Sequence, residues 1–435
     1  MPSAIFLEVA STPPLEEGIS SCFIKHVREI MMSENSEQWA RAQDEADPLR
    51  RFRSRFYIPA DTVYLAGNSL GLQPKKARDY VEAELDDWAK LGVEGHFKAR
   101  NPWLSYHELL TEQTARLVGA RPSEVVVMNT LTVNLHLMMV SFYRPTAERN
   151  KILIEAGAFP SDQYAVSSQA AFRRGEVVQL ERGENPVERI DRDGSSIALV
   201  MLGNVNYLTG EAFDMRAIAK AAHEKGCVVG FNLAHGAGNL LLQLHDDDVD
   251  FAVWCSYKYL NAGPGAVAGC FIHERHAADK NLPRFAGWWG HNKETRFQMG
   301  PVFDPIPGAE GWQLSNPPIL QLAALRASME IFDEAGMPAV RKKSEQLTGY
   351  VEFLIDRLPS GFCEIITPRE SERRGAQLSL RIKKNAKRLV EKLAAAGVIC
   401  DFREPDIVRV APAPLYNTFT DVWQCARALE QYASG

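Results

Sequence analysis

Apolar runs and helical patterns alternate along the chain from about residue 120 onward. Helical patterns begin, for example, at Thr132 and Met215. Continuous apolar strands separated by helices predict an α/β fold with a mostly parallel sheet covered on both faces. Ligands of such sheets bind at the carboxyl ends of the strands. The strand-like runs occupy residues 124–128, 151–154, 197–202, 227–231, 251–254 and 265–272.

The pattern changes after a Pro-rich segment at residues 316–319. Beyond it, the spacing of apolar positions predicts two long helices and then a mixed α+β unit. The helices are predicted over 320–335, 340–358 and 386–396, and the strands over 376–382 and 407–410.

These patterns divide the chain into a large and a small domain. The first 60 residues carry a helical pattern with no strand partner nearby, so we expect them to pack with the small domain. The predicted division is an N-terminal segment 1–60, a large domain 61–320 and a small C-terminal α+β domain 321–435.

Composition narrows the function classes. A chain of 435 residues with a net charge of −6 suits a two-domain enzyme rather than a binder of nucleic acid or anionic membranes. No apolar run reaches membrane-spanning length. The seven cysteines are odd in number and show no metal-site spacing, so we expect a reduced, cytoplasmic protein without a metal centre.

Lys258 is the strongest chemical signal in the chain. It follows the apolar run 250–255 directly, lies between Tyr257 and Tyr259, and precedes a Gly/Pro turn at 262–265. Burial beside aromatic rings lowers the pKa of a lysine and frees its amine to form a Schiff base. An ordinary surface lysine at a strand end is the alternative.

Seven motifs follow one another along the chain: YLAGNSLGLQP from residue 64, NTLTVNLH from 129, AFPSDQY from 158, SYKYLNAG from 256, GWWGH from 287, SNPPI from 315 and VAPAPLYN from 410. Together they resemble the motifs of the kynureninases, which are pyridoxal-phosphate enzymes of the aspartate-aminotransferase fold (fold type I). The resemblance spans roughly residues 50 to 430. It implies a large cofactor-binding domain, a small α+β domain, and hydrolysis of L-kynurenine or its 3-hydroxy form to an anthranilate and L-alanine.

The resemblance assigns cofactor roles residue by residue. Lys258 and Tyr257 are the implied catalytic residues, and Lys258 carries the cofactor. Ordinary structural roles are open for several others, since Thr often caps a helix and Phe often lies in a core. The implied cofactor-binding set is Leu131, Thr132, Phe159, Asp162, Asn232, His235, Tyr257, Lys258, Trp288 and Asn316.

Substrate-binding roles follow in the same way. The resemblance places Ser69, His96 and Asn316 around the aryl group of a small amino-acid substrate and Arg409 on its α-carboxylate. A solvated Arg on an edge strand is the alternative for Arg409. Some of these residues would come from a second subunit, so the resemblance implies a homodimer with its active site at the subunit interface.

Two residues depart from the family pattern. Asn232 stands where the family has an Asp that pairs with the protonated pyridine nitrogen, and Asn204 stands at what resembles a glycine position. A neutral amide supplies no charge, and if the glycine-like position needs a positive φ, Asn is the residue that tolerates it best after glycine. Three hypotheses follow: a kynureninase, a homologue with altered pyridoxal chemistry, and a binding protein whose catalysis has decayed.

Overall fold

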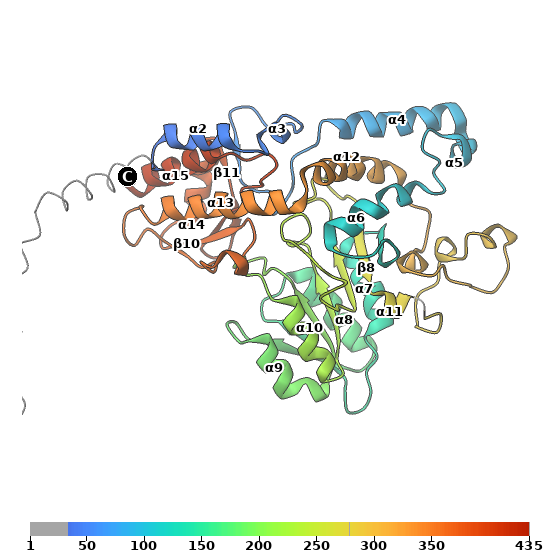
Figure 1. Cartoon of the computed structure of the whole chain (residues 1–435). Helices are drawn as coiled ribbons and strands as arrows, with labels where there is room; N and C mark the ends of the chain where they lie inside the picture. Colours follow the sequence, from blue (N-terminus) through green and yellow to red (C-terminus); the bar gives the residue numbers. More distant parts are fainter. Residues whose placement is uncertain (1–33, 278, 435) are drawn as a thin grey trace, which may run out of the picture.

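A seven-stranded sheet forms the centre of the molecule (Figure 1). The computed structural model describes residues 34–277 and 279–434, and expectations for residues 1–33 lie outside this part. All strands of the sheet run parallel except β8, which pairs antiparallel with both neighbours. The order is β2 (Val125–Met128), β8 (Ala268–Ile272), β7 (Phe251–Trp254), β6 (Val228–Asn232), β5 (Ile197–Gly203), β3 (Lys151–Glu155) and β4 (Glu176–Leu180). The predicted mostly parallel α/β sheet is therefore confirmed.

Both faces of this sheet are buried, as continuous apolar strands require. Along β7, Ala252 and Trp254 enter a first core while Phe251 and Val253 enter a second core on the other face. The first core receives α6 (Thr111–Val118), α10 (Met215–Glu224) and α12 (Ile319–Ala335), and the second receives α7 (Leu131–Phe142) and α8 (Pro160–Phe172). Helix α4 (Lys76–Leu91) lies alongside α12, and α9 (Pro186–Asp193) packs against α10 (Figure 1).

The C-terminal part contains an antiparallel sheet with a third core. Its strand order is β12 (Asp401–Arg403), β13 (Ile407–Val410), β10 (Leu378–Ile382) and β9 (Cys363–Ile365). The helices that contribute to its core are α13 (Met337–Ile355), α14 (Ala386–Ala395) and α15 (Phe419–Ser434). A short parallel pair, β1 (Val63–Tyr64) with β11 (Val398–Ile399), connects this part to the segment that precedes α4.

The N-terminal helix α2 (Glu37–Ala46) packs against α15. The carboxylate of Asp44 accepts hydrogen bonds from the backbone N–H groups of Phe419, at 2.6 Å, and Thr420, at 3.1 Å. These bonds satisfy open donors at the start of α15. The short helix α3 (Arg50–Arg53) places Phe52 in the first core instead, so residues 34–60 contact both parts of the molecule. Helix α12 begins at the predicted boundary and packs with the central sheet, and the division into domains stays a prediction.

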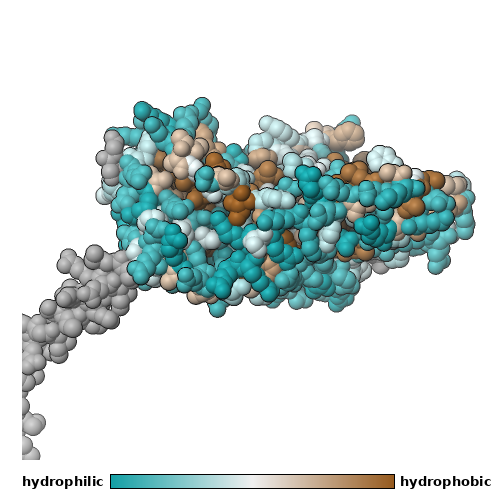
Figure 2. All heavy atoms as spheres, turned by 90° about the horizontal axis from the view of Figure 1, so that it is seen from above, coloured by the Kyte–Doolittle hydropathy of each residue, from teal (hydrophilic) through white to brown (hydrophobic). Residues whose placement is uncertain are grey.

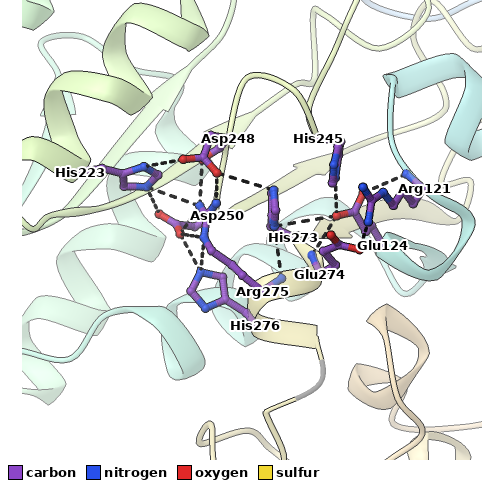
Figure 3. A network of polar contacts seen from close by, with 10 residues as sticks. All are labelled: Arg121, Glu124, His223, His245, Asp248, Asp250, His273, Glu274, Arg275 and His276. Atoms are coloured by element: carbon purple, nitrogen blue, oxygen red, sulfur yellow. Dashed lines mark hydrogen bonds and ion pairs between the residues drawn. The ribbon is translucent and has the colours of Figure 1, made fainter.

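A polar network around the buried Asp250 closes the end of the sheet where β7 begins (Figure 3). Asp250 accepts hydrogen bonds from the backbone of Val229, at 2.7 Å, and from Arg275, and it contacts the rings of His223 and His276. Burial pushes the pKa of Asp250 up, but the hydrogen bonds from His223 and His276 outweigh it and hold the pKa below the usual range. The carboxyl ends of the strands lie at the opposite end of the sheet.

Two further observations concern the described residues only. None of their helices combines the length and the apolar character needed to cross a membrane. The six cysteines in the described part of the chain are all free thiols, as expected for a reduced protein.

Candidate active site

A pocket lies at the carboxyl ends of β2, β3, β5, β6 and β7, where the parallel sheet predicts a ligand. It encloses ≈ 700 Å³ of empty space, including its open mouth. Eight of the predicted residues line it, all from strand ends or from the loops and helices that follow them. The lining is Thr130, Leu131, Thr132, Glu155, Phe159, Ser161, Asp162, Gly203, Val205, Tyr207, Asn232, Ala234, His235, Tyr257 and Lys258.

The amine of Lys258 projects into this pocket. Its Nζ lies 3.0 Å from Nε2 of His235 and 5.7 Å from the ring centroid of Phe159. Burial lowers the pKa of Lys258, and the positive charges of Arg409 and Arg403 lower it further. The neutral amine, which is the nucleophilic form, is therefore more accessible than in an exposed lysine.

The start of α7 offers an anion site at the pocket wall. Thr130 is the N-cap residue, with φ −121° and ψ 164°, yet its side chain makes no capping hydrogen bond. The first-turn N–H groups therefore keep their donors for an anion, and the Thr130 and Thr132 side chains line the same pocket. The alternative was that the Thr130 side chain simply caps the helix, and the structure does not show that capping hydrogen bond.

Phe159 is not a core residue. Its side chain is 42% exposed, and its ring meets that of Tyr207 edge-on, with centroids 5.3 Å apart. Phe159 precedes α8 directly, where Pro160 occupies the first helical turn. An exposed aromatic face within a polar pocket is suited to stacking on a planar ligand.

Asp162 and Asn232 form one unit at the bottom of the pocket. Nδ2 of Asn232 donates to both carboxylate oxygens of Asp162, at 2.8 and 2.9 Å, and its Oδ1 accepts from the backbone of Ala234. Burial raises the pKa of Asp162 to about 6, and the Asn232 hydrogen bonds and the Lys258 charge oppose that rise. The neutral amide of Asn232 is therefore hydrogen-bonded to a buried carboxylate, which the identity of residue 232 alone does not show.

His235 is buried beside Lys258 and uncharged. Burial lowers its pKa well below the usual range, and the nearby charges of Lys258, Arg409 and Arg403 act in the same direction. Its Nδ1 is buried without a hydrogen-bond partner among the described residues. Since a buried polar atom without a partner is costly, this nitrogen is suited to a ligand.

The position of Asn204 does not require a left-handed backbone. Asn204 does not belong to the described residues with positive φ. Its backbone extends β5 by donating to the carbonyl of Asn232, at 3.1 Å, and its side chain is buried against Gly236. The position is set by packing rather than by backbone freedom.

Among the polar residues of the pocket, sequence reasoning missed Glu155, Ser161 and Tyr207. Glu155 gave a usable signal, because it is a carboxylate directly at the end of the apolar strand β3. Burial raises its pKa to about 7, although Asn206 donates a hydrogen bond to it at 2.9 Å. Ser161 and Tyr207 carry no comparable signal.

The raised pKa of Glu155 makes protein stability depend on pH. A folded pKa above the unfolded value contributes stability below pH ~4.5, and this stability is lost as the pH rises through about 7. Glu155→Gln keeps an acceptor for Asn206 and removes the charge, so it should stabilise the protein at pH 8 by ~1–3 kcal/mol and change little at pH 5. Urea unfolding at both pH values measures this, with the exposed Glu176→Gln as control. Equal effects at both pH values would contradict it.

The remaining predicted residues lie outside this pocket within the chain. Arg409 contacts a residue that lines the pocket, because its Nη1 donates to the carbonyl of Tyr207 at 2.7 Å. Ser69 lies beside Arg409. Trp288 donates to Asn316 at 3.1 Å in the segment between β8 and α12. His96, on the short helix α5 (Gly95–Lys98), packs against Trp103. The chain does not bring Trp288, Asn316 and His96 to Lys258, and their predicted roles require a second subunit.

Two other clusters of His and carboxylate side chains occur among the described residues. In the first, Glu124 contacts His245 at 2.9 Å, and the ring of His273 stacks on that of His245 at 15° and 4.9 Å (Figure 3). An ion cannot lie in the planes of two stacked rings, as imidazole coordination requires. In the second, which contains Glu108 and Glu310, the ammonium of Lys293 lies 2.9 and 2.6 Å from their oxygens and neutralises them.

Comparison with solved structures identifies the fold. A cysteine desulfurase from Thermococcus onnurineus NA1 superposes with a TM-score of 0.77 at 14% identity, over 88% of this chain and 98% of that one. A mutant of C-DES with glycine covalently linked to its PLP cofactor gives a TM-score of 0.75 at 17% identity, over 87% and 99%. The pocket fits pyridoxal phosphate, because it combines a lysine of lowered pKa, an open helix N-terminus, an exposed aromatic face and a buried carboxylate. Fold and site define a pyridoxal-phosphate-dependent enzyme of fold type I.

Sequence relatives identify the family within this class. Kynureninase from Myxococcus xanthus (strain DK1622) is 65% identical over 417 residues, which cover 92% of this chain and 98% of the relative. Kynureninase from Koribacter versatilis (strain Ellin345) is 60% identical over 420 residues, with the same shares. The family model of the kynureninase C-terminal domain matches residues 340–429. The chain belongs to the kynureninase family.

Proposed function

We propose that this chain hydrolyses the Cβ–Cγ bond of L-kynurenine, or of its 3-hydroxy form, to anthranilate or 3-hydroxyanthranilate and L-alanine. The identity of 65% to a kynureninase over nearly its whole length carries this conclusion. The pocket supports it, since Lys258, His235, Asp162 and Asn232 meet at one point at the end of the sheet.

The chain's own residues divide the work around the cofactor. Pyridoxal phosphate, when bound, supplies an electron sink for carbanions. Leu131 and Thr132 at the start of α7, with Tyr257, hold its phosphate, and Phe159 covers its ring. Lys258 binds the cofactor and moves the proton at the substrate's Cα, a role that its lowered pKa favours.

Asn232 orients the carboxylate of Asp162 toward the ring nitrogen and stabilises its ionised form. Asn232→Leu removes both donors with little change in volume, so the pKa of Asp162 should rise above about 6 by a further ~1–2 units. We expect kcat at pH 7 to fall about tenfold and the acid limb of the pH–rate profile to move upward. A pH profile of kcat measures both, and an unmoved acid limb would show that Asn232 does not act through Asp162.

Asn232→Asp is the matched variant for this pair. It would place a second carboxylate in contact with Asp162, and like charges at that distance do not both ionise. The pair would keep about one negative charge at neutral pH, so we expect kcat within about threefold of the parent. A large gain from replacing this neutral amide is not expected, because Asp162 already supplies the charge. A gain above tenfold would contradict this.

The enzyme acts as a homodimer with its active site at the subunit interface. Exposed apolar side chains support this: Leu85 and Trp88 on α4, and Val93 and Phe97 around α5, are 40% to 78% exposed. Figure 2 shows apolar side chains on the upper face, including the end of the molecule where α4 and α5 lie. His96 is the neighbour of Phe97, so a partner that covers this face would meet His96. We also propose a cytoplasmic location, which the six free cysteines support.

A product assay tests the proposed reaction. Purified protein with pyridoxal phosphate and L-kynurenine should release anthranilate and L-alanine in equal amounts, followed by anthranilate fluorescence and by amino-acid analysis. Binding of kynurenine without release of anthranilate would contradict the proposal. Altered chemistry and decayed catalysis, the two alternatives, find no support in the site or in the relatives.

A further inference from the structure

The guanidinium predicted to bind the substrate's carboxylate already makes hydrogen bonds within the protein through both Nη atoms, while its Nε has no partner among the described residues. Arg409 lies on β13 with its side chain 1% exposed. Its Nη1 donates to the carbonyl of Tyr207 at 2.7 Å, and its Nη2 donates to Ser69 Oγ at 3.2 Å and to Asp401 Oδ2. Because Nη2 already serves two acceptors, no edge of the guanidinium is free for the bidentate contact that a carboxylate prefers.

Asp401 is built into this position by the small sheet. β12 and β13 are antiparallel, and Asp401 is the direct partner of Arg409 across the ladder. Directly opposed residues project on the same face with Cβ atoms about 5 Å apart. The hydroxyl of Ser69 also donates to Asp401 Oδ2. The carboxylate therefore reaches Arg409 without a change of backbone.

A second arginine holds the same carboxylate from its other side. Nη1 of Arg403 lies 3.1 Å from Oδ1 of Asp401, and Nη2 donates to Oδ2 at 3.1 Å. Two guanidiniums share one carboxylate, so the cluster has one excess positive charge in a site where Asp401 is only 9% exposed. That charge is sensed at the reacting centre, since Arg409 and Arg403 both lower the pKa of Lys258 after burial. A second carboxylate would neutralise it.

We propose that Asp401 is a positioning residue that occupies Arg409 in the substrate-free enzyme and gives it up to the α-carboxylate of the substrate. This inference rests on the proposed role of Arg409 as the carboxylate clamp. When the substrate arrives, Asp401 keeps its two contacts with Arg403 and releases Nη2 of Arg409. The number of ion pairs is therefore the same before and after the exchange. A ligand without a carboxylate cannot replace Asp401 at Arg409.

Because a carboxylate ligand must displace Asp401, its apparent affinity is lowered. If Arg409 is free in about a tenth of the molecules, the apparent affinity for a carboxylate ligand is about tenfold below its intrinsic value. Removing the Asp401 carboxylate removes this loss of apparent affinity. Asp401→Asn should therefore tighten the binding of carboxylate ligands while leaving ligands without a carboxylate unaffected.

The test compares L-alanine with L-alaninamide, which lacks the carboxylate. The holoenzyme is titrated with each, and the dissociation constants are taken from the absorbance of the bound cofactor. Asp401→Asn should raise the ratio of the alaninamide constant to the alanine constant by about tenfold. Asp406→Asn is the matched control, because Asp406 is an exposed carboxylate beside β13 whose ion pair is with Arg381. An unchanged or lower ratio in Asp401→Asn overturns the inference.

Further variants and crystal structures test the same inference independently. If Asp401→Asn does not fold, Asp401→Ser replaces it with the same expected rise. Crystal structures of the parent holoenzyme with and without L-alanine need no variant, and there the contact between Asp401 and Arg409 should be lost on binding; a retained contact overturns the inference. Arg409→Lys separates it from the proposed function. A ratio that falls in Arg409→Lys but does not rise in Asp401→Asn rejects the role of Asp401 alone, whereas a ratio unmoved by Arg409→Lys rejects Arg409 as the clamp.

Discussion

Replacing Lys258 with alanine is expected to lower kcat for anthranilate release by about 10³–10⁴-fold. The amine is the only lysine nitrogen among the lining groups of the pocket within the described chain, and no neighbouring group there can replace it as base at the Cα position. The nearest nitrogen, Nε2 of His235, lies 3.0 Å from it and belongs to a ring whose pKa burial lowers. Steady-state kinetics with L-kynurenine measures the loss.

The fold should survive this change. Lys258 contacts His235 and the aromatic faces of Phe159 and Tyr257, and burial disfavours its charged form. Removing it should therefore leave the melting temperature within a few degrees. Lys343→Ala is the contrasting variant, because Lys343 forms a buried ion pair with Asp47 at 2.7 Å and its loss should destabilise by ~3–5 kcal/mol. Residual activity above a hundredth of the parent in Lys258→Ala would contradict the assignment.

Arg409→Lys is expected to lower kcat/KM for L-kynurenine by ~2–4 kcal/mol, or roughly 30- to 1000-fold. Lysine keeps the charge but offers one nitrogen, whereas Arg409 holds Tyr207, Ser69 and Asp401 through two. The loss should lie mainly in KM if the carboxylate is bound equally in the ground and transition states. Asp406→Asn, whose ion pair is with Arg381 and not with Arg409, should show the parent's kinetics. Unchanged kcat/KM in Arg409→Lys would place the carboxylate elsewhere.

The large domain follows from local patterns. Strands such as β2, β5 and β7 are continuous apolar runs, and burial on both faces of a parallel sheet is what makes such runs necessary. The same reasoning places chemistry at strand ends, and Lys258, Thr132, Phe159 and Asn232 all line the pocket there. Periodicity and topology place these positions at strand ends, whereas the choice of Thr132, Phe159 and Asn232 as cofactor-binding residues came from the family resemblance.

Pairings between distant segments were not predictable in this way. Asn232 and Asp162 are 70 positions apart, and only the fold shows that their side chains form one hydrogen-bonded unit. The sequence left the backbone at Asn204 open, and only the fold shows that φ is not positive there and that its side chain packs against Gly236. Asp401 is eight positions from Arg409, but nothing in the local pattern indicates that β12 and β13 pair in the register that opposes them.

The central claim is that the cofactor is bound at Lys258, at the carboxyl end of the central sheet. The most direct test is borohydride reduction of the holoenzyme, followed by proteolysis and mass spectrometry of the labelled peptides. We predict about one pyridoxyl group per chain, on the peptide that contains Lys258 between Tyr257 and Tyr259. The other buried lysine, Lys343, has a lowered pKa as well but is paired with Asp47, so it should remain unlabelled. A stoichiometric label on Lys343 or on any lysine other than Lys258 would contradict the account.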